Sequence, residues 1–562
     1  MSNRQGRRAS RYLLAAAAPV AIGLFSASPA AAATSCSQLA TSFHRANTTI
    51  TAAEVIPAGT FQGRTGLPTF CRVAGYTTPT SDSHIQFEVW MPESGWNLKY
   101  LQVGCGGFCG SIPYYNMDEP LRRGYAVAGT DDGHEWNGGD AAWATGHPEK
   151  VIDFGGRALK ETADAAKAVI MALKSSSARR SYFMGCSGGG REALRAAQRY
   201  PEDFDGIVAG SPANDWNDLM TQFVWNQNVV AATSSGTLSQ SDLDVLSSAV
   251  LAQCAGHDGG LSTDRFLNNP QACKFNPAKL PLAADKIRTI EQLFAGPAGV
   301  SPGYRLGADE ASDRDGWPAW LTGNGVPNLP YAPERLLGNN WLSEVVFPNS
   351  GWTPTTNSVQ VNAHWAKVRT GAAMNATDPD LHAFKRRGGK LLEYSGWGDS
   401  AVSPEVHIGY YNAVAKEIGG HEATRDFYRL FMVPGMGHCA EGPGGNVFGQ
   451  IGDRRTPLTN PENPHWYNPP NPSDPSDDIL TALDNWVENK IAPDELIGTK
   501  YVNGDSTQGI AFQRTLCPYP QVAKYKGKGS TTSAASFACV GSDHNDHDKE
   551  DNDHDKEASN QE

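Results

Sequence analysis

The sequence predicts an α/β fold in which a large insertion interrupts a mostly parallel sheet. Strand-like and helix-like segments alternate up to residue 213, the alternation resumes after residue 377, and the segment between them differs in composition. The chain has 562 residues, of which 40% are hydrophobic. That length exceeds the size at which one hydrophobic core usually stops growing, so we expect a main domain and a second unit.

The predicted strands are short apolar segments. Ile85, Phe87, Val89 and Met91 occupy every second position, a period of two that is typical of a strand. Further strands are predicted at Lys99–Val103, 125–129, 181–185 and 205–210, with a helix at 158–173. The second set consists of a strand at 390–395, a helix at Pro404–Ile418, a strand at Tyr428–Val433 and a helix at 477–489. Strands that alternate with helices indicate parallel pairing.

Glycine, proline, asparagine and tryptophan accumulate in residues 214–377, and the alternation fades there. We interpret this segment as a lid that is inserted into a main domain formed by residues 34–213 and 378–540. The alternative is a separate domain with its own core, because tryptophans are more often core residues than substrate contacts.

The N-terminal residues 1–33 predict a secretory signal peptide. Four arginines precede the apolar stretch 13–25, and a run of small residues ends at Ala33. The stretch is short and rich in alanine, which disfavours the alternative of a membrane anchor. Arg7 and Arg8 leave twin-arginine and general export both open.

The C-terminal residues 541–562 contain nine acidic residues and two lysines. They cannot form a core, so we predict a disordered acidic tail, and its three histidines leave metal chelation as an alternative. The tail carries about half of the net charge of −13, so the rest of the chain is mildly acidic and gives no support for nucleic-acid binding.

Ten cysteines follow the predicted cleavage region, and none of them forms a CxxC pair. Scattered cysteines do not suit a zinc site, whereas an even number in an exported chain indicates a disulfide framework.

The segment Gly185-Cys186-Ser187-Gly188-Gly189 matches the motif G-x-S-x-G. The motif alone is weak evidence in a chain with 59 glycines. Here, however, it lies between the predicted strand 181–185 and a predicted helix, Gly188–Arg199, which is the strand–turn–helix that a nucleophile elbow requires. Ser187 is therefore the candidate nucleophile, and the first amides of the helix suit an oxyanion.

A serine nucleophile needs a histidine base and a carboxylate that orients the base. In the α/β-hydrolase fold these follow the serine in the order Asp or Glu, then His, in loops after late strands. Asp399 follows the strand at 390–395, and His438 follows the strand Tyr428–Val433. Cys186 precedes the nucleophile and Cys439 follows the base, so a bridge between them would bring Ser187 and His438 within reach of each other.

Several of these motifs resemble the tannase and feruloyl esterase family. They are Gly185–Arg191, the segments 197–201 and 203–207, the segment Thr130-Asp131-Asp132-Gly133-His134, the loop after residue 395 and Gly437-His438-Cys439, and the likeness extends from about Cys36 to Cys539. The resemblance implies an α/β-hydrolase with a lid. It implies that the enzyme cleaves galloyl, feruloyl, chlorogenic or terephthalate esters. It implies the triad Ser187, Asp399 and His438, and oxyanion donors at the amides of Gly188 and Gly106, with a neighbour of Gly106 as the alternative.

The family pattern also implies disulfides, above all the one that joins the two catalytic loops. The predicted pairs are Cys36–Cys71, Cys105–Cys109, Cys186–Cys439, Cys254–Cys273 and Cys517–Cys539, of which Cys105–Cys109 is assigned by elimination. Members of the family bind calcium in the lid, and the matching segment 254–264 here retains Asp258 and Asp264 but has Ala255 where the family has aspartate. Two carboxylates with backbone carbonyls can hold calcium. The alternative is a metal-free loop closed by Cys254–Cys273.

We therefore expect a secreted serine esterase that acts on small aromatic esters and needs no cofactor for its chemistry. A peptidase or thioesterase with the same triad, or an inactive binding protein of the same fold, is the alternative. No nucleic-acid or membrane partner is expected, and the sequence indicates no oligomeric state.

Overall fold

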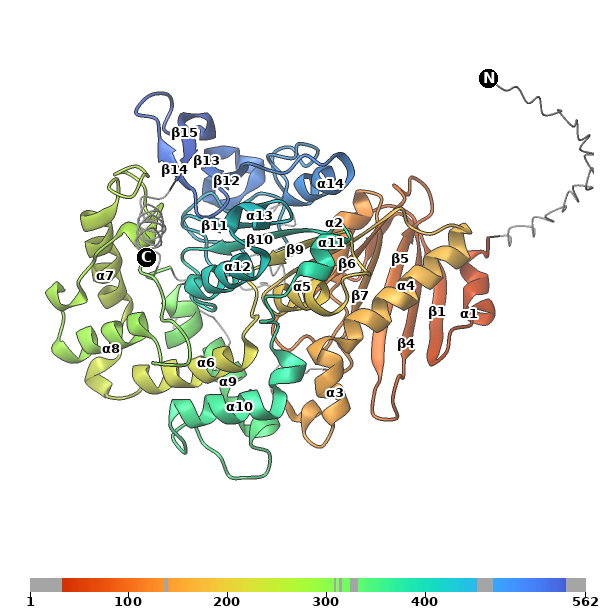
Figure 1. Cartoon of the computed structure of the whole chain (residues 1–562), viewed down its shortest axis with the longest axis horizontal. Coiled ribbons are helices and arrows are strands. Elements are labelled where there is room, and N and C mark those ends of the chain that lie inside the picture. The colour runs from red at the N-terminus through yellow and green to blue at the C-terminus, as the bar shows by residue number, and fades with distance from the viewer. Residues whose placement is uncertain are drawn as a thin grey trace, which may run out of the picture.

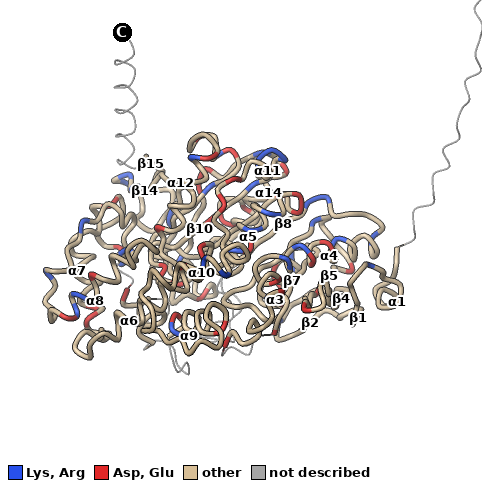
Figure 2. The backbone as a smooth tube through the Cα atoms, turned by 60° about the horizontal axis from the view of Figure 1, so that its bottom comes forward, with Lys and Arg blue, Asp and Glu red and all other residues tan. Residues whose placement is uncertain are grey.

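The computed structural model describes residues 33–135, 140–307, 310–312, 316–323, 332–451 and 468–541 (Figure 1). The predicted signal peptide up to residue 32 and the predicted tail after Gly541 lie outside the described residues. Basic and acidic residues are interspersed along the described chain (Figure 2). Among the described helices, none is both long and apolar enough to cross a membrane.

Nine strands form one sheet in the order β1-β4-β5-β7-β6-β8-β9-β10-β11. Neighbours from β7 to β11 in that order are parallel, whereas β1, β4 and β5 are antiparallel to their neighbours. The strands are β1 Thr48–Ile56, β4 Phe70–Thr77, β5 Ile85–Pro92, β6 Lys99–Val103, β7 Ala126–Thr130, β8 Arg180–Cys186, β9 Gly206–Gly210, β10 Lys390–Gly396 and β11 Tyr428–Val433. The predicted parallel sheet is thus extended at one end by an antiparallel part.

Helices cover both faces of this sheet. One face packs against α4, α5 and α12, and the other packs against α2 and α14. The helices of the main domain are α1 Leu39–Ser42, α2 Tyr114–Arg122, α3 Pro148–Ile152, α4 Ala158–Lys174, α5 Gly188–Arg199, α11 His382–Arg386, α12 Pro404–Ile418, α13 His421–Arg425 and α14 Ile479–Asn489. The predicted strands and helices all occur, and β6, α5, α12 and β11 have the predicted bounds.

The insertion between β9 and β10, for which we keep the name lid, is helical in its described residues and lies beside the sheet as one group (Figure 1). Its helices are α6 Trp216–Val230, α7 Gln240–Cys254, α8 Ala284–Ala295, α9 Pro333–Asn340 and α10 Val359–Met374. A cluster of buried residues from 229 to 321, including Trp317, gives it a core of its own. A second cluster joins the lid to the main domain, and Trp216 and Trp341 are buried there beside Phe108. Most lid tryptophans are therefore core residues.

Three small hairpins complete the described fold. They are β2 Gly59–Phe61 with β3 Arg64–Leu67, β12 Leu496–Tyr501 with β13 Ile510–Leu516, and β14 Val522–Tyr525 with β15 Phe537–Val540. The last two form a C-terminal unit that contacts β11, because the Tyr519 amide donates to the Leu430 carbonyl oxygen at 2.7 Å. The sequence analysis did not identify these hairpins, nor β1 and β4.

Candidate active site

Ser187 lies in the sharp turn between β8 and α5. Its φ and ψ angles are 62° and −118°, a conformation that non-glycine residues adopt rarely and that marks strained functional turns. The turn depends on glycine, because a Cβ atom on Gly185 would lie 2.5 Å from the Gly189 carbonyl oxygen. Ser187 is partly exposed, and its side chain makes no capping hydrogen bond to α5. The structure thus contains the predicted strand–turn–helix with an accessible hydroxyl.

His438 and Asp399 lie in the loops after β11 and β10, as predicted. His438 Nδ1 is 2.9 Å from Asp399 Oδ2 and 3.1 Å from Oδ1. The amides of Ala401 and Val402 donate to Asp399 Oδ1 at 2.9 and 2.8 Å. Burial acts to raise the pKa of Asp399, but the charge and hydrogen bond of His438 outweigh it and hold that pKa below its usual value. The carboxylate is therefore ionised and fixes the orientation of the imidazole.

A disulfide links the nucleophile turn to the base loop. Cys186 and Cys439 are bonded, with their Cα atoms 5.9 Å apart. His438 Nε2 is buried and has no hydrogen-bond partner, so the structure does not contain a hydrogen bond from Ser187 to this nitrogen. Such bonds are often long before substrate binds. The Asp399–His438 half of the predicted triad is formed, and the disulfide joins the residue before Ser187 to the residue after His438.

The loop after β6, residues 104–110, packs directly on the start of α5, and we call it the glycine loop. A Cβ atom on Gly188 would lie 2.9 Å from the Cys105 carbonyl oxygen and 3.1 Å from that of Gly107. This close approach requires glycine at position 188 and brings Gly106 next to the N-terminus of α5. In the described part of the chain, neither the Gly106 amide nor the Gly188 amide donates a hydrogen bond to a protein acceptor.

Comparison with known proteins identifies the family of this chain. A family model described as tannase and feruloyl esterase matches residues 71–540. The chain belongs to the tannase and feruloyl esterase family. It is 37% identical over 534 residues to an uncharacterized esterase of Xanthomonas campestris, covering 88% of this chain and 89% of the relative. A probable feruloyl esterase B-1 of Aspergillus flavus is 29% identical over 487 residues, covering 84% and 86%.

The solved structure of feruloyl esterase B from Aspergillus oryzae is similar to this family member with a TM-score of 0.77 and 26% identity. The match covers 90% of this chain and 99% of that chain. The predicted α/β-hydrolase fold and the predicted membership of the family are confirmed. This protein is thus an esterase that hydrolyses carboxylic esters.

The lid of this esterase contributes a residue that the sequence analysis did not assign to the site. Trp320 lies in a short helical turn, Pro318–Thr322, and its ring centroid is 5.0 Å from that of His438, with an angle of 82° between the planes. Trp320 is partly exposed, unlike the buried Trp317 and Trp341. The sequence gives only a weak signal for it, since it is one of several tryptophans in the lid.

The predicted calcium residues have protein partners in this esterase. Asp258 accepts hydrogen bonds from the amides of Gly260 and Asn269, each at 3.2 Å, and from that of Asn268. Asp264 accepts from the Leu261 amide at 3.1 Å. Its other oxygen lies 2.6 Å from a guanidinium nitrogen of Arg514, which β13 supplies.

This arrangement does not fit a calcium ion between Asp258 and Asp264. The guanidinium of Arg514 already supplies the positive charge beside Asp264 that calcium would supply, and the Asp258 carboxylate already accepts three amide hydrogen bonds. Cys254–Cys273 closes the loop, and all five disulfides have the predicted pairing.

Proposed function

We propose that this family member is an exported serine esterase that cleaves esters of aromatic acids through an acyl-enzyme on Ser187. The observation that carries the proposal is the Asp399–His438 pair, held beside the nucleophile turn by Cys186–Cys439. A buried carboxylate, an oriented imidazole and a partly exposed serine are the groups that acyl transfer needs.

In the proposed mechanism, Ser187 Oγ attacks the ester carbonyl carbon while His438 Nε2 takes its proton. The negative charge on the carbonyl oxygen is stabilised by the amides of Gly106 and Gly188, and the dipole of α5 acts in the same direction. His438 then gives the proton to the leaving alcohol. A water molecule, deprotonated by the same histidine, attacks the acyl carbon and releases the acid and Ser187.

The proposed preference for aromatic acids rests on the lid. Trp320 lies beside the proposed base, His438, and is partly exposed, so an aromatic side chain borders the place where the acyl group reacts. The relatives named feruloyl esterase are consistent with such a substrate. Export rests on the N-terminal signal and on five disulfides, which form and persist in oxidising compartments.

The test combines active-site labelling with a substrate panel. A fluorophosphonate probe is expected to label the wild-type protein and not Ser187→Ala. Turnover is then compared on methyl gallate, methyl ferulate, chlorogenate, a terephthalate monoester and the acetyl ester of the same alcohol. Faster turnover of acetyl esters than of all aromatic esters would refute the proposed substrate class. Equal turnover of an amide or a thioester would support the peptidase or thioesterase alternative.

A further inference from the structure

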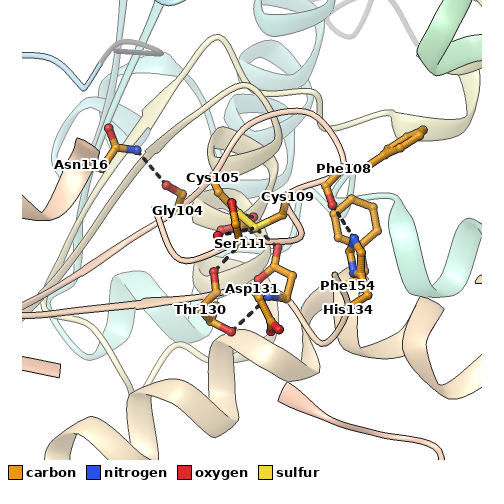
Figure 3. The surroundings of a disulfide bond; sticks show 12 residues. Gly104, Cys105, Phe108, Cys109, Ser111, Asn116, Thr130, Asp131, His134 and Phe154 are labelled. Atoms are coloured by element: carbon orange, nitrogen blue, oxygen red, sulfur yellow. Dashed lines mark hydrogen bonds between the residues drawn. A yellow bond between two sulfur atoms is a disulfide. The ribbon is translucent and has the colours of Figure 1, made fainter. Parts of the chain in front are cut away.

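A short disulfide closes the glycine loop. Cys105 and Cys109 are bonded, and Figure 3 shows this bridge beside the end of β7 and the residues around it. The bridge therefore encloses Gly106, Gly107 and Phe108, the part of the loop that contacts Gly188 at the start of α5.

The residues on each side of the glycine pair are held by hydrogen bonds. The Gly104 amide donates to the Met184 carbonyl oxygen at 2.9 Å, and the Asn116 side chain donates to the Gly104 carbonyl oxygen at 2.9 Å (Figure 3). On the other side, His134 Nε2 lies 2.6 Å from the Phe108 carbonyl oxygen (Figure 3). Both ends of the loop are thus fixed to the body of the protein.

The glycine pair itself has fewer restraints. Gly106 accepts one hydrogen bond, from the Cys109 amide at 3.0 Å, and Gly107 has a φ angle of 59°. Cys109 also has a positive φ angle, 60°, which is unfavourable for a residue with a side chain. Two adjacent glycines have the largest conformational freedom of any dipeptide, so the bridge is the covalent restraint that limits it.

Two buried carboxyl groups enclose the sulfur of Cys105. Asp132 Oδ2 lies 3.6 Å and Glu192 Oε1 lies 3.7 Å from Cys105 Sγ, and both residues are at most 1% exposed. The two side chains are hydrogen bonded to each other, and the Cys105 amide donates to Glu192. Burial raises the pKa of Glu192 well above its usual value, and the neighbouring charge of Asp132 acts in the same direction. The contacts with the two carboxyl groups hold the Cys105 sulfur in place beside α5.

The bridge is poorly suited to stabilise the fold by restricting the unfolded chain. The entropy that a disulfide removes increases with the length of the loop that it closes. Cys105 and Cys109 are 4 residues apart, whereas the other four bridges span 19 to 253 residues. In the chain-entropy model, Cys105–Cys109 therefore stabilises the fold least among the five bridges. Its location beside the start of α5 points to a local geometric role.

We propose that the Cys105–Cys109 disulfide is a positioning element, which fixes the Gly106 amide in the orientation that stabilises the oxyanion. This role rests on the esterase mechanism proposed above. The orientation of the Gly106 amide matters in the transition state, where negative charge develops on the carbonyl oxygen. It has little effect on the affinity for the substrate.

The test compares two double variants, Cys105→Ala with Cys109→Ala, and Cys36→Ala with Cys71→Ala. The control bridge joins the N-terminal segment to β4, which lies near the end of the sheet opposite β11 and away from β8. We expect removal of Cys105–Cys109 to lower kcat on methyl ferulate about 10- to 100-fold and to change KM less than about threefold. The control variant, assayed below its melting temperature, keeps the wild-type kcat.

A second measurement separates oxyanion stabilisation from general loosening. An aryl boronic acid forms a tetrahedral anion on the serine, whereas ferulate binds as the product. We expect the inhibition constant of the boronic acid to increase by the same factor as kcat decreases, while that of ferulate changes less than about threefold. If the alanine variant does not fold, Cys105→Val with Cys109→Ala retains more apolar volume and takes its place.

A folded variant with kcat and boronic acid affinity within twofold of wild type would overturn the proposal. Equal losses in ferulate and boronic acid affinity would also overturn it, because they would show a general disturbance of the site. Failure of the esterase mechanism itself is recognised separately, since Ser187→Ala would then retain turnover.

Discussion

The ring of Trp320 meets the ring of His438 edge to face, with centroids 5.0 Å apart. The two residues are far apart in the sequence, one in the lid and one after β11, so the lid reaches the catalytic base itself. In the mechanism that we propose, an indole in this position would limit the access of water to the imidazole and border the acyl group.

We expect Trp320→Ala to lower kcat/KM for methyl ferulate about tenfold more than for the matching acetyl ester. The reason is that a ring-to-ring contact stabilises only the aromatic acyl group. Trp320→Phe is expected to recover most of the loss. Trp365→Ala, on the exposed side of α10, serves as the control and leaves both rates unchanged. Equal losses on the two esters would exclude a role in acyl recognition.

Ser187→Ala is expected to reduce ester turnover at least about a thousandfold without loss of the fold, because the change removes one partly exposed hydroxyl and opens no core cavity. Steady-state rates on methyl ferulate and a thermal melt measure both effects. Retention of more than a tenth of the activity would refute the assignment of the nucleophile.

The double variant Cys186→Ala with Cys439→Ala is expected to lower kcat more than it raises KM. These cysteines are 253 residues apart in sequence, and closing so long a loop stabilises by about 5 kcal/mol in the chain-entropy model. The kinetic effect arises because a displacement of about 1 Å between Ser187 and His438 can cost about a hundredfold in rate. A variant that melts above the assay temperature and keeps the wild-type kcat would limit the bridge to a stabilising role.

The lid should lose stability as the pH rises, because of Glu334. Its carboxyl group is fully buried and accepts hydrogen bonds from the Tyr304 hydroxyl, at 2.7 Å, and from the Asn226 amide. Burial raises the pKa of Glu334 to about 8. Since the folded state holds the proton more tightly than the unfolded state, this stabilisation is complete at pH values below the unfolded pKa and is lost as the pH rises through 8.

Glu334→Gln mimics the protonated acid, so we expect its melting temperature to exceed that of wild type by a margin that increases from pH 5 to pH 9. The side-chain amide of Asn226 can rotate so that its oxygen accepts a hydrogen bond from the new glutamine amide. Asn226 Oδ1 has no hydrogen-bond partner in the described structure. Glu417→Gln, at an exposed position of α12, is the control. A margin that does not change with pH would contradict the prediction.

We expect EDTA to leave the melting temperature unchanged, whereas Arg514→Gln destabilises the protein by about 3–5 kcal/mol. The Arg514 and Asp264 side chains are 5% and 8% exposed, so removal of the guanidinium leaves a buried carboxylate without its cation. The Arg514 guanidinium also lies over the ring of Phe512 and over that of Phe537. A decrease in melting temperature with EDTA that calcium reverses would show that the lid loop binds the metal after all.

The sequence predicts best where a local signal marks an element. α12 begins with Pro404 at its first position and ends before Gly419, which has a φ angle of 102°, so its bounds follow from two residues. The candidate residues Ser187, Asp399 and His438 follow from a motif and from their order along the chain. The strand β1 was missed because it lies at the edge of the sheet, and its half-exposed residues carry no clear alternation.

Other parts of the site depend on contacts between distant segments. Trp320 reaches His438 only because the lid is docked on the loop of Asp399, where the Ser403 hydroxyl donates to the Gly303 carbonyl oxygen at 2.7 Å. The pairing of Asp264 with Arg514 joins residues 250 positions apart. No local pattern in the sequence encodes either contact, so the role of Trp320 and the protein partner of Asp264 could not be predicted.

The Cys186–Cys439 bond makes the lid part of a closed covalent ring, because the whole insertion lies between the two linked cysteines. A protease that cuts once within the lid therefore produces two fragments that cannot separate. The fragment with Ser187 and the fragment with Asp399 and His438 stay joined next to the catalytic residues. Such a nicked molecule would migrate as a full-length chain in a denaturing gel until a reductant is added, and a single cleavage in a protease-rich environment would not by itself disassemble the catalytic centre.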